Sequence, residues 1–160
     1  MGTKKIRGFE HVSGKQWQKD FNAIAPLPNL PSRATAHSAG YDVFSSMDFS
    51  LEPSEEIKIP TGFKAYMQPD EFLMFVPRSG LGFKYYTRLA NTIGVGDSDY
   101  YNNDGNEGHY RVKIRNEGDK TLQVKFGDAI AQAVFQKYLI VDNDDFSGEK
   151  RVGGFGSTNK

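Results

Sequence analysis

The sequence contains no cysteine. This absence excludes disulfide bonds, thiolate metal sites and a cysteine nucleophile. Histidine is also scarce, and the three histidines are far apart with no ligand spacing, so a zinc site is not expected: His11, His37 and His109. A phosphate-binding loop of the G-x-x-x-x-G-K-[ST] type does not occur either.

The sequence also lacks an excess of either charge and any long apolar run. Twenty basic residues balance twenty acidic ones, so no global field attracts a nucleic acid or a membrane, and an anion site has to be local. No apolar run reaches the roughly 18 residues of a membrane-spanning helix, and the first residues lack a signal-peptide core. We therefore expect a cytoplasmic protein, or one of a host cytoplasm if the gene is phage-borne, with neither nucleic acid nor membrane as partner.

The sequence does contain many short runs in which apolar and polar side chains alternate, and clusters of turn residues separate these runs. The runs at 63–67, 110–115 and 122–126 alternate apolar and polar side chains, and 72–76 is continuously apolar, as in a strand buried on both faces. Many short strands with regular turns predict an all-β sandwich, jelly roll or barrel, with at most one short helix, within 80–89.

The chain divides into three parts by composition. Residues 1–25 form an atypical N-terminal segment, with a possible edge strand at 6–12 and Trp17 and Phe21 placed to share one face of a helical turn. Residues 26–142 carry the β domain. Residues 143–160 are polar and glycine-rich, which predicts a flexible C-terminal arm.

Polar and glycine residues interrupt the strand pattern at five places, and such interruptions tend to mark functional sites. Four are turns or the arm: 39–42, 77–80, 91–106 and 151–158. The fifth is Gln132, an amide inside the apolar run 130–135. Each has a structural alternative: a turn cap at Asp42 or Asp97, a helix N-cap at Ser79, a core hydrogen bond at Gln132.

The chemistry at 77–80 suits a phosphate group. Arg78 supplies a bidentate guanidinium, Ser79 a hydroxyl and the turn at Gly80 free backbone N–H groups, directly after the most apolar strand. The arm carries Phe155 between glycines, followed by Ser157 and Thr158, as in a segment that closes over a ligand.

Taken together and in order, these blocks resemble the five motifs of the trimeric deoxyuridine triphosphatases (dUTPases), over about residues 31–160. The resemblance implies a β-rich jelly roll of the dUTPase type and a homotrimer with shared active sites. It also implies that the arm of one subunit closes over a site built by the other two. The five blocks are Ala39-Gly40-Tyr41-Asp42-Val43, Pro77-Arg78-Ser79-Gly80-Leu81, Asn91 to Tyr100, Gly127-Asp128-Ala129-Ile130-Ala131-Gln132, and Arg151 to Thr158.

The implied reaction is Mg²⁺-dependent hydrolysis of dUTP to dUMP and pyrophosphate, which supplies a dTTP precursor and keeps uracil out of DNA. Asp97 is the implied general base, and Asp42 contacts the water shell of the magnesium ion. The residues implied to bind phosphate are Arg78, Ser79, Gly80, Gln132, Arg151, Ser157 and Thr158. The residues assigned to uracil and deoxyribose are Asn91, Val95, Gly96, Tyr100, Phe155 and Arg111, although Arg111 alternates with Lys113 and Arg115 as on a solvated strand face.

The sequence departs from the family pattern in four places, one of them Ala129, which replaces a usual arginine or lysine. Gly96 stands where an apolar residue usually precedes the catalytic aspartate, which we expect to loosen the hairpin. Residues 101–106 look like an insertion, and we expect a longer loop near the site. In the arm, Lys150 and Arg151 compete for one basic position.

Two other functions were weighed against dUTP hydrolysis. A dCTP deaminase of the same superfamily needs a glutamate where this chain has Lys113, so that reading is disfavoured. A regulatory protein of the dUTPase fold, binding a protein partner through the loop 101–106, is the alternative that stays open.

Overall fold

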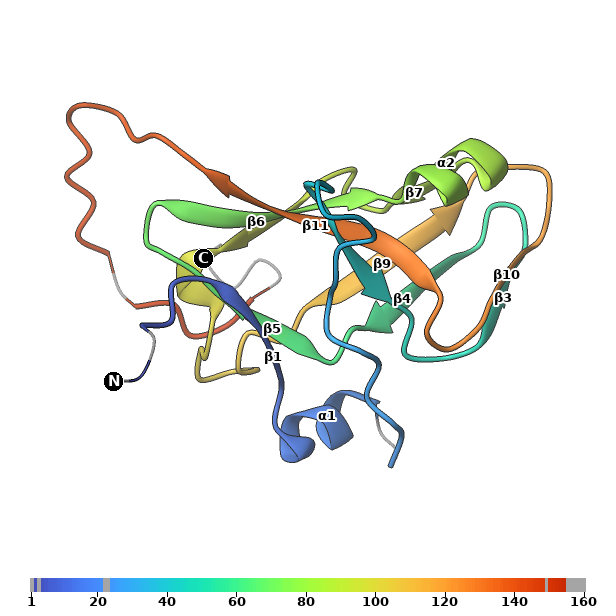
Figure 1. The fold of residues 1–160 in the computed structure, drawn as a ribbon, viewed down its shortest axis with the longest axis horizontal. Helices are drawn as coiled ribbons and strands as arrows, with labels where there is room; N and C mark the ends of the chain where they lie inside the picture. Colours follow the sequence, from blue (N-terminus) through green and yellow to red (C-terminus); the bar gives the residue numbers. More distant parts are fainter. Residues whose placement is uncertain (1, 3, 22–23, 149, 155–160) are drawn as a thin grey trace.

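The computed structural model describes residues 2, 4–21, 24–148 and 150–154, and its strands form four antiparallel sheets (Figure 1). The largest has the order β2-β11-β6-β8, and a second has the order β4-β9-β7; β1 pairs with β5 and β10 with β3. The strands are β1 Gly8–His11, β2 Tyr41–Phe44, β3 Phe49–Leu51, β4 Glu56–Pro60, β5 Phe63–Tyr66, β6 Glu71–Pro77, β7 Thr87–Leu89, β8 Gly94–Asp97, β9 Arg111–Asn116, β10 Leu122–Val124 and β11 Ala129–Lys137. The predicted all-β architecture is confirmed.

The described chain has two α-helices, α1 (Gly14–Phe21) and α2 (Ser79–Tyr85), and one 3-10 turn (Ser98–Tyr100). The expected limit of one short helix therefore fails at the N-terminal segment. There, the Ser13 hydroxyl accepts a hydrogen bond from the Gln16 N–H at 3.1 Å and begins the helix as an N-cap residue does. The Trp17 and Phe21 rings lie on one face, 4.9 Å apart. Neither helix is long and apolar enough to cross a membrane.

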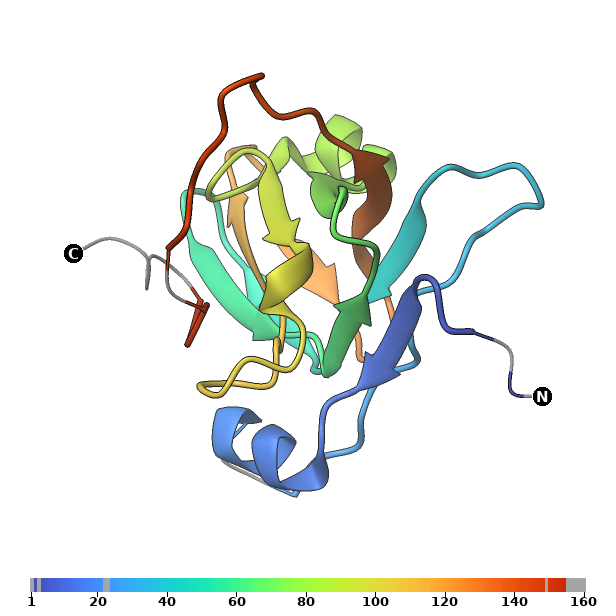
Figure 2. The same cartoon turned by 90° about the vertical axis from the view of Figure 1, so that its left-hand side faces the viewer.

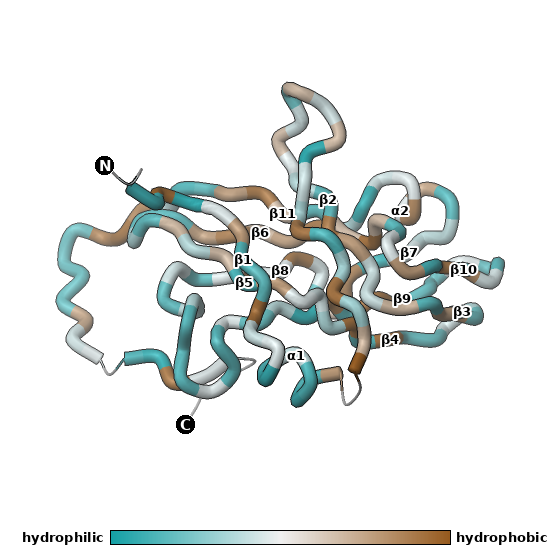
Figure 3. The backbone as a smooth tube through the Cα atoms, turned by 60° about the horizontal axis from the view of Figure 1, so that its bottom comes forward, coloured by the Kyte–Doolittle hydropathy of each residue, from teal (hydrophilic) through white to brown (hydrophobic). Residues whose placement is uncertain are grey.

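The core lies between the sheets and is built from the apolar half of each alternating strand, with Ile59, Phe63, Leu73, Ile114 and Ile130 almost completely buried. Hydrophobic residues accordingly concentrate in the strands, whereas the connecting segments are mostly hydrophilic (Figure 3). β6 differs from the expectation of a strand buried on both faces. Leu73 and Phe75 are buried, but Phe72, Met74 and Val76 on its other face are only half-buried.

Helix α1 lies outside the sheets, directly below the loop that follows the 3-10 turn (Figure 2). The backbone N–H of Ser13 donates to the Glu107 carboxylate at 2.9 Å, which ties the start of α1 to that loop. At the other end of the chain, the segment after β11 swings away from the body and then returns (Figure 1). Along this segment Leu139, Ile140 and Val141 are exposed.

Candidate active site

The register of the largest sheet places several predicted site residues on one face. Directly opposed residues of antiparallel strands point to the same side of a sheet. The face thus carries three rows across the strands: Asp42, Gln132 and Val76; Val134, Met74 and Val95; Gln136, Phe72 and Asp97. Phe72, Met74, Val76 and Val134 are half-buried and Val95 is exposed, so an apolar strip separates the polar ends of this face.

The first group of predicted residues lies where β2, β11 and the end of β6 meet. The Arg78 guanidinium approaches the Asp42 carboxylate at 3.8 Å. Gln132 pairs with Asp42 across the strands, and its side chain packs on Gly40, where a Cβ would come within 2.5 Å of the Gln132 Oε1. Glycine at position 40 thus allows the amide to lie beside Asp42. Ser79 and Gly80 follow at the start of α2, both exposed, and Ser79 is the first helical residue rather than the N-cap.

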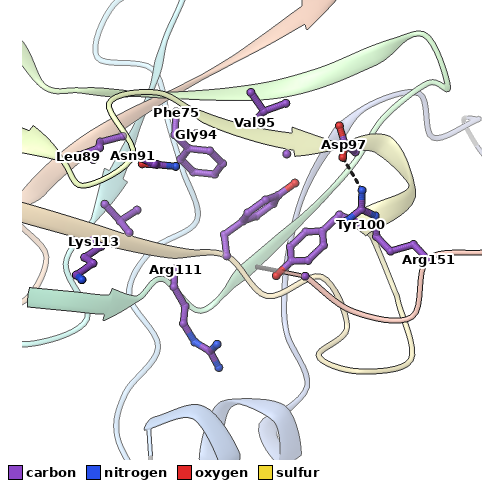
Figure 4. A pocket seen from close by; sticks show the side chains of 14 residues that line it. Phe75, Leu89, Asn91, Gly94, Val95, Asp97, Tyr100, Arg111, Lys113 and Arg151 are labelled. Carbon is purple, nitrogen blue, oxygen red and sulfur yellow. Dashed lines mark hydrogen bonds and ion pairs between the residues drawn. The ribbon is translucent and has the colours of Figure 1, made fainter. Parts of the chain in front are cut away.

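The second group surrounds a cavity of about 340 Å³ between β7, β8 and β9. Asn91 and Asp97 lie at opposite ends of it in Figure 4. The lining residues are Phe75, Leu89, Asn91, Gly94, Val95, Gly96, Asp97, Tyr100, Tyr110, Arg111, Val112, Lys113, Arg151 and Gly154. Seven predicted site residues therefore line one cavity, and their roles stay a prediction: Asn91, Val95, Gly96, Asp97, Tyr100, Arg111 and Arg151.

Tyr100 is fixed by the loop 101–106. Its hydroxyl donates to the His109 carbonyl oxygen at 2.8 Å and accepts from the Asn106 Nδ2 at 2.9 Å. Asn103, which is buried, donates to the Tyr100 carbonyl oxygen and to the Asn106 Oδ1, both at 2.8 Å. Burial raises the pKa of the Tyr100 hydroxyl, so this group stays protonated at neutral pH. The expected longer loop is present, and it supports a residue of the pocket.

Arg151 reaches the cavity from the arm of the same chain and pairs with two aspartates there, whereas the resemblance implied an arm that closes over a site of other subunits. Its guanidinium donates to the Asp97 Oδ2 at 2.5 Å (Figure 4). It also donates to the Asp99 Oδ1 at 2.7 Å. Burial alone would lower the pKa of Arg151, but the hydrogen bond to Asp99 and the two carboxylate charges outweigh it, so the pKa is raised. Without a ligand, this cation thus neutralises the carboxylate predicted to be the base. Lys150, its competitor, is exposed.

The Arg111 guanidinium points away from Asn91 and Asp97, toward α1 (Figure 4), where Asp20 holds it. The same carboxylate accepts from the His109 Nδ1 at 2.5 Å and from the Gln16 Nε2 at 2.6 Å. Burial would raise the pKa of Asp20, but these hydrogen bonds and the Arg111 charge hold it below its usual range. The His109 Nε2 accepts the Gly62 N–H at 2.8 Å, which identifies the neutral ring, and burial lowers the pKa of His109.

Sequence reasoning missed Tyr110, a second tyrosine in the cavity wall, and the Asp20–His109 pair behind it. Gly96 is the signal that could have led to Tyr110. A Cβ at position 96 would collide with the Tyr110 hydroxyl, so the glycine is required by close packing, and β8 stays regularly paired with β6 there. Nothing in the sequence marks Asp20, because its partners lie about 90 residues away.

The remaining predicted residues divide into two sets. Arg78, Ser79, Gly80, Gln132 and Asp42 do not line the cavity of this chain. Phe155, Ser157 and Thr158 lie outside the described residues.

Three comparisons with known proteins agree with one another. A family model described as dUTPase matches residues 28–159. The deoxyuridine 5'-triphosphate nucleotidohydrolase of Lactococcus lactis subsp. lactis is 44% identical over 155 residues, which cover 96% of this chain and 98% of that protein. The enzyme of the same name from Desulfitobacterium hafniense is 40% identical over 139 residues, covering 82% and 87%.

Among solved structures, the dUTPase from Streptococcus mutans is similar with a TM-score of 0.70 and 36% identity. The match covers 84% of this chain and 98% of that one.

Proposed function

The chain belongs to the dUTPase family, and we propose that it cleaves dUTP between the α- and β-phosphates, with Asp97 as general base. The observation that supports this most is the cavity, which has an amide at one end and a carboxylate at the other. A nucleotide whose base contacts Asn91 directs its phosphates toward Asp97.

In this mechanism the Asp97 carboxylate takes a proton from a water molecule as the water oxygen attacks the α-phosphorus. The bond from the α-phosphorus to the bridging oxygen breaks, and pyrophosphate leaves with that oxygen and the bonding electron pair. In the free chain the Arg151 guanidinium occupies the Asp97 Oδ2, and its departure makes both carboxylate oxygens available to the attacking water. We infer that Arg151 then pairs with the phosphates of the substrate, which offer it a stronger anionic partner.

The residues that line the cavity would also select the base and the sugar of the nucleotide. The Asn91 side chain and the backbone of Val95 and Gly96 would pair with the uracil edge, and a cytosine would leave buried polar groups unpaired there. Tyr100, held by Asn106 and the His109 carbonyl, would pack against the deoxyribose and leave no room for a 2′-hydroxyl.

Mg²⁺ is the proposed cofactor, and the donor set fits it. Asp42 offers one partly exposed carboxylate beside Arg78, which suits an ion that keeps most of its water and binds through few protein ligands. When bound, Mg²⁺ reduces the negative charge of the triphosphate. Arg78, Ser79, the Gly80 backbone and Gln132 would bind the phosphate oxygens on the same side.

We further infer that each complete site combines residues from different subunits of a homotrimer. In one chain the Asp97 row and the Asp42–Gln132 row are four residues apart on β6, or about 13 Å along the strands. β8 and β2 are also separated by two strands, which adds about 14 Å across the sheet. These two groups are too far apart to hold one triphosphate. The half-buried apolar strip between them and the exposed Leu139–Val141 segment are surfaces that a neighbouring subunit would cover.

The test is pyrophosphate release from dUTP with Mg²⁺, compared with dCTP, dTTP and UTP. The D97N variant should lose at least about a hundredfold in kcat, because the general base is removed. The matched control is D99N, which removes the other carboxylate on Arg151 and should stay within a few-fold of wild type. Equal losses in both variants would show that Asp97 acts through its ion pair rather than as the base.

A further inference from the structure

Asn106 lies in the loop 101–106, and its side chain bonds to a residue of the cavity wall. Its Nδ2 donates to the Tyr100 hydroxyl at 2.9 Å. Its Oδ1 accepts two hydrogen bonds, from the Asn103 Nδ2 at 2.8 Å and from the Gly108 N–H at 3.0 Å. Because an amide oxygen can only accept, these two donors fix the orientation of the Asn106 amide, and its Nδ2 has to point at the hydroxyl.

The Tyr100 hydroxyl is held by two partners of different kinds. Its one proton goes to the His109 carbonyl oxygen at 2.8 Å, and the same hydroxyl oxygen accepts from Asn106. Beside the ring lies Tyr110, with ring centroids 5.0 Å apart. The Tyr100 ring is therefore held at its tip by two hydrogen bonds and along one side by a second aromatic ring.

Another side of the Tyr100 ring faces the cavity, where the arm covers it. Tyr100 is one of the lining residues and lies beside Arg151 (Figure 4). With the arm in place it is 6% exposed, and a Cβ added to Gly154 would lie 2.4 Å from the Tyr100 Cε2. Since Gly154 follows Arg151 by three residues, a movement of the arm that frees Asp97 would also uncover this side of the ring.

A wall that excludes a 2′-hydroxyl by its shape has to be rigid. Ribose carries one oxygen atom more than deoxyribose, and a wall displaced by about 1 Å would relieve part of the clash with that atom. The hydrogen bond from Asn106 opposes such a displacement, because any movement of the ring away from the cavity moves the hydroxyl off its partners.

We propose that Asn106 is a positioning residue for sugar selection, which keeps the Tyr100 ring where a 2′-hydroxyl would collide with it. The proposal rests on the proposed function, since it takes dUTP as the occupant of the cavity and Tyr100 as the residue beside its sugar. Asn106 acts through Tyr100 and itself needs no contact with the nucleotide. The loop 101–106, which lies outside the five family motifs, thereby takes part in the choice of substrate.

The experiment measures kcat/KM for dUTP and for UTP in wild type, N106A, Y100F and the double variant. In N106A the ratio of dUTP to UTP should fall roughly three- to tenfold, the effect of one lost hydrogen bond, with kcat for dUTP changed less than about twofold. In Y100F the ratio should fall at least as far, because both hydrogen bonds of the hydroxyl are lost. Adding N106A to Y100F should lower the ratio no further, since Asn106 then has no hydroxyl to hold.

D104A is the matched control, because it changes an exposed residue of the same loop, and it should leave the ratio as in wild type. The unfolding temperature of N106A should fall, since the loop also loses the bonds from Asn103 and Gly108. A smaller fraction of folded protein lowers kcat/KM for both nucleotides by the same factor. The ratio therefore reports the geometry of the wall and not the stability of the loop.

An unchanged ratio in N106A would overturn the proposal, as would a ratio that N106A lowers equally in wild type and in Y100F. Wild-type turnover of dUTP would leave the proposed function intact in either case. Absence of dUTP turnover in wild type would instead overturn the proposed function and this role with it. If N106A failed to fold, Y100F would decide, because Asn106 acts through that hydroxyl, and an unchanged ratio in Y100F would overturn the proposal.

Discussion

His109 is the residue on which the N-terminal segment and the cavity wall converge. It is 0% exposed, donates to Asp20 on α1, and precedes Tyr110 in the cavity wall. Its Nε2 has to remain an acceptor for the Gly62 N–H. A protonated ring has no acceptor, so protonation would break this bond and place a second proton in a buried site.

This residue should make stability depend on pH. Its folded pKa is lowered from the ordinary value near 6.5, so below that pH the unfolded chain binds more protons than the folded one. The free energy of unfolding should therefore be constant above pH 7 and fall as the pH drops below about 6.5. The loss reaches about 1.4 kcal/mol for each unit by which the folded pKa is lowered. Urea unfolding at pH 7.5 and 5.5 measures it.

The variant H109Q should flatten that dependence, although its stability at pH 7.5 is lower. The control is H37Q, which changes an exposed histidine and should leave the slope as it is in wild type. A wild-type slope that survives in H109Q would assign the pH dependence to other groups.

At the scale of elements, the loop 101–108 and helix α1 work together as a support for Tyr100. The loop closes on itself through the Asn103 side chain, whose Oδ1 accepts from the Gly105 N–H at 3.0 Å and from the Asn106 N–H at 3.1 Å. From below, Ser13 binds Glu107 and Trp17 contacts His109 with ring centroids 5.9 Å apart. The loop therefore has an internal role, and binding of a protein partner through it stays a prediction.

The variant N103A should test this support. It removes hydrogen bonds to buried backbone and to Asn106, so we expect a loss of about 2 kcal/mol in the free energy of unfolding. We also expect a several-fold rise in KM for dUTP, because Tyr100 loses its fixed position. D104A changes the adjacent exposed residue and should alter neither quantity. If N103A lost stability at unchanged KM, the loop would be structural only.

The strands and the site differ in how far the sequence predicts them. Alternation at 110–115 and 122–126 predicted β9 and β10 closely because side chains on a half-buried strand follow the pleat. The sequence predicts four candidate site residues because they lie within one short stretch that resembles a family motif: Asn91, Val95, Asp97 and Tyr100.

Features that depend on contacts across long sequence separations were not predictable. Gly96 predicted a loose hairpin, yet it is packed against Tyr110, and this contact is visible only once β9 lies beside β8. Helix α1 is eight residues long and weakly patterned, and it is held by Glu107, His109 and Arg111, which no local rule connects to it.

At the scale of the whole molecule, the predicted site is divided into two distant groups. This division predicts how trimers that mix two inactive variants should behave. Neither D97N nor R78A should turn over dUTP well as a pure protein. In mixed trimers, some sites receive an intact Asp97 from one subunit and an intact Arg78 from another. Every trimer that contains both variants has one site in three with an intact Asp97 and an intact Arg78, so the mixed trimers should show about a third of wild-type activity.

Coexpression of two differently tagged variants, with purification through both tags, supplies the mixed trimers. A D97N chain mixed with D97N of the other tag is the control and should stay inactive. If the D97N and R78A mixture also stayed inactive, both residues would have to act within one chain. The cytoplasmic location stays a prediction at this scale.

If Asp97 is the catalytic base as proposed, the arm that carries Arg151 is a tethered competitor of the substrate. About a dozen residues separate β11 from Arg151, and a flexible tether of that length keeps its end at an effective concentration in the millimolar range near the cavity. Dilution of the protein does not weaken this contact, because the competitor travels with the carboxylate that it covers. Under the proposed mechanism, each turnover would exchange the partner of Arg151: the triphosphate would draw the guanidinium away from Asp97, and the departure of pyrophosphate would return it.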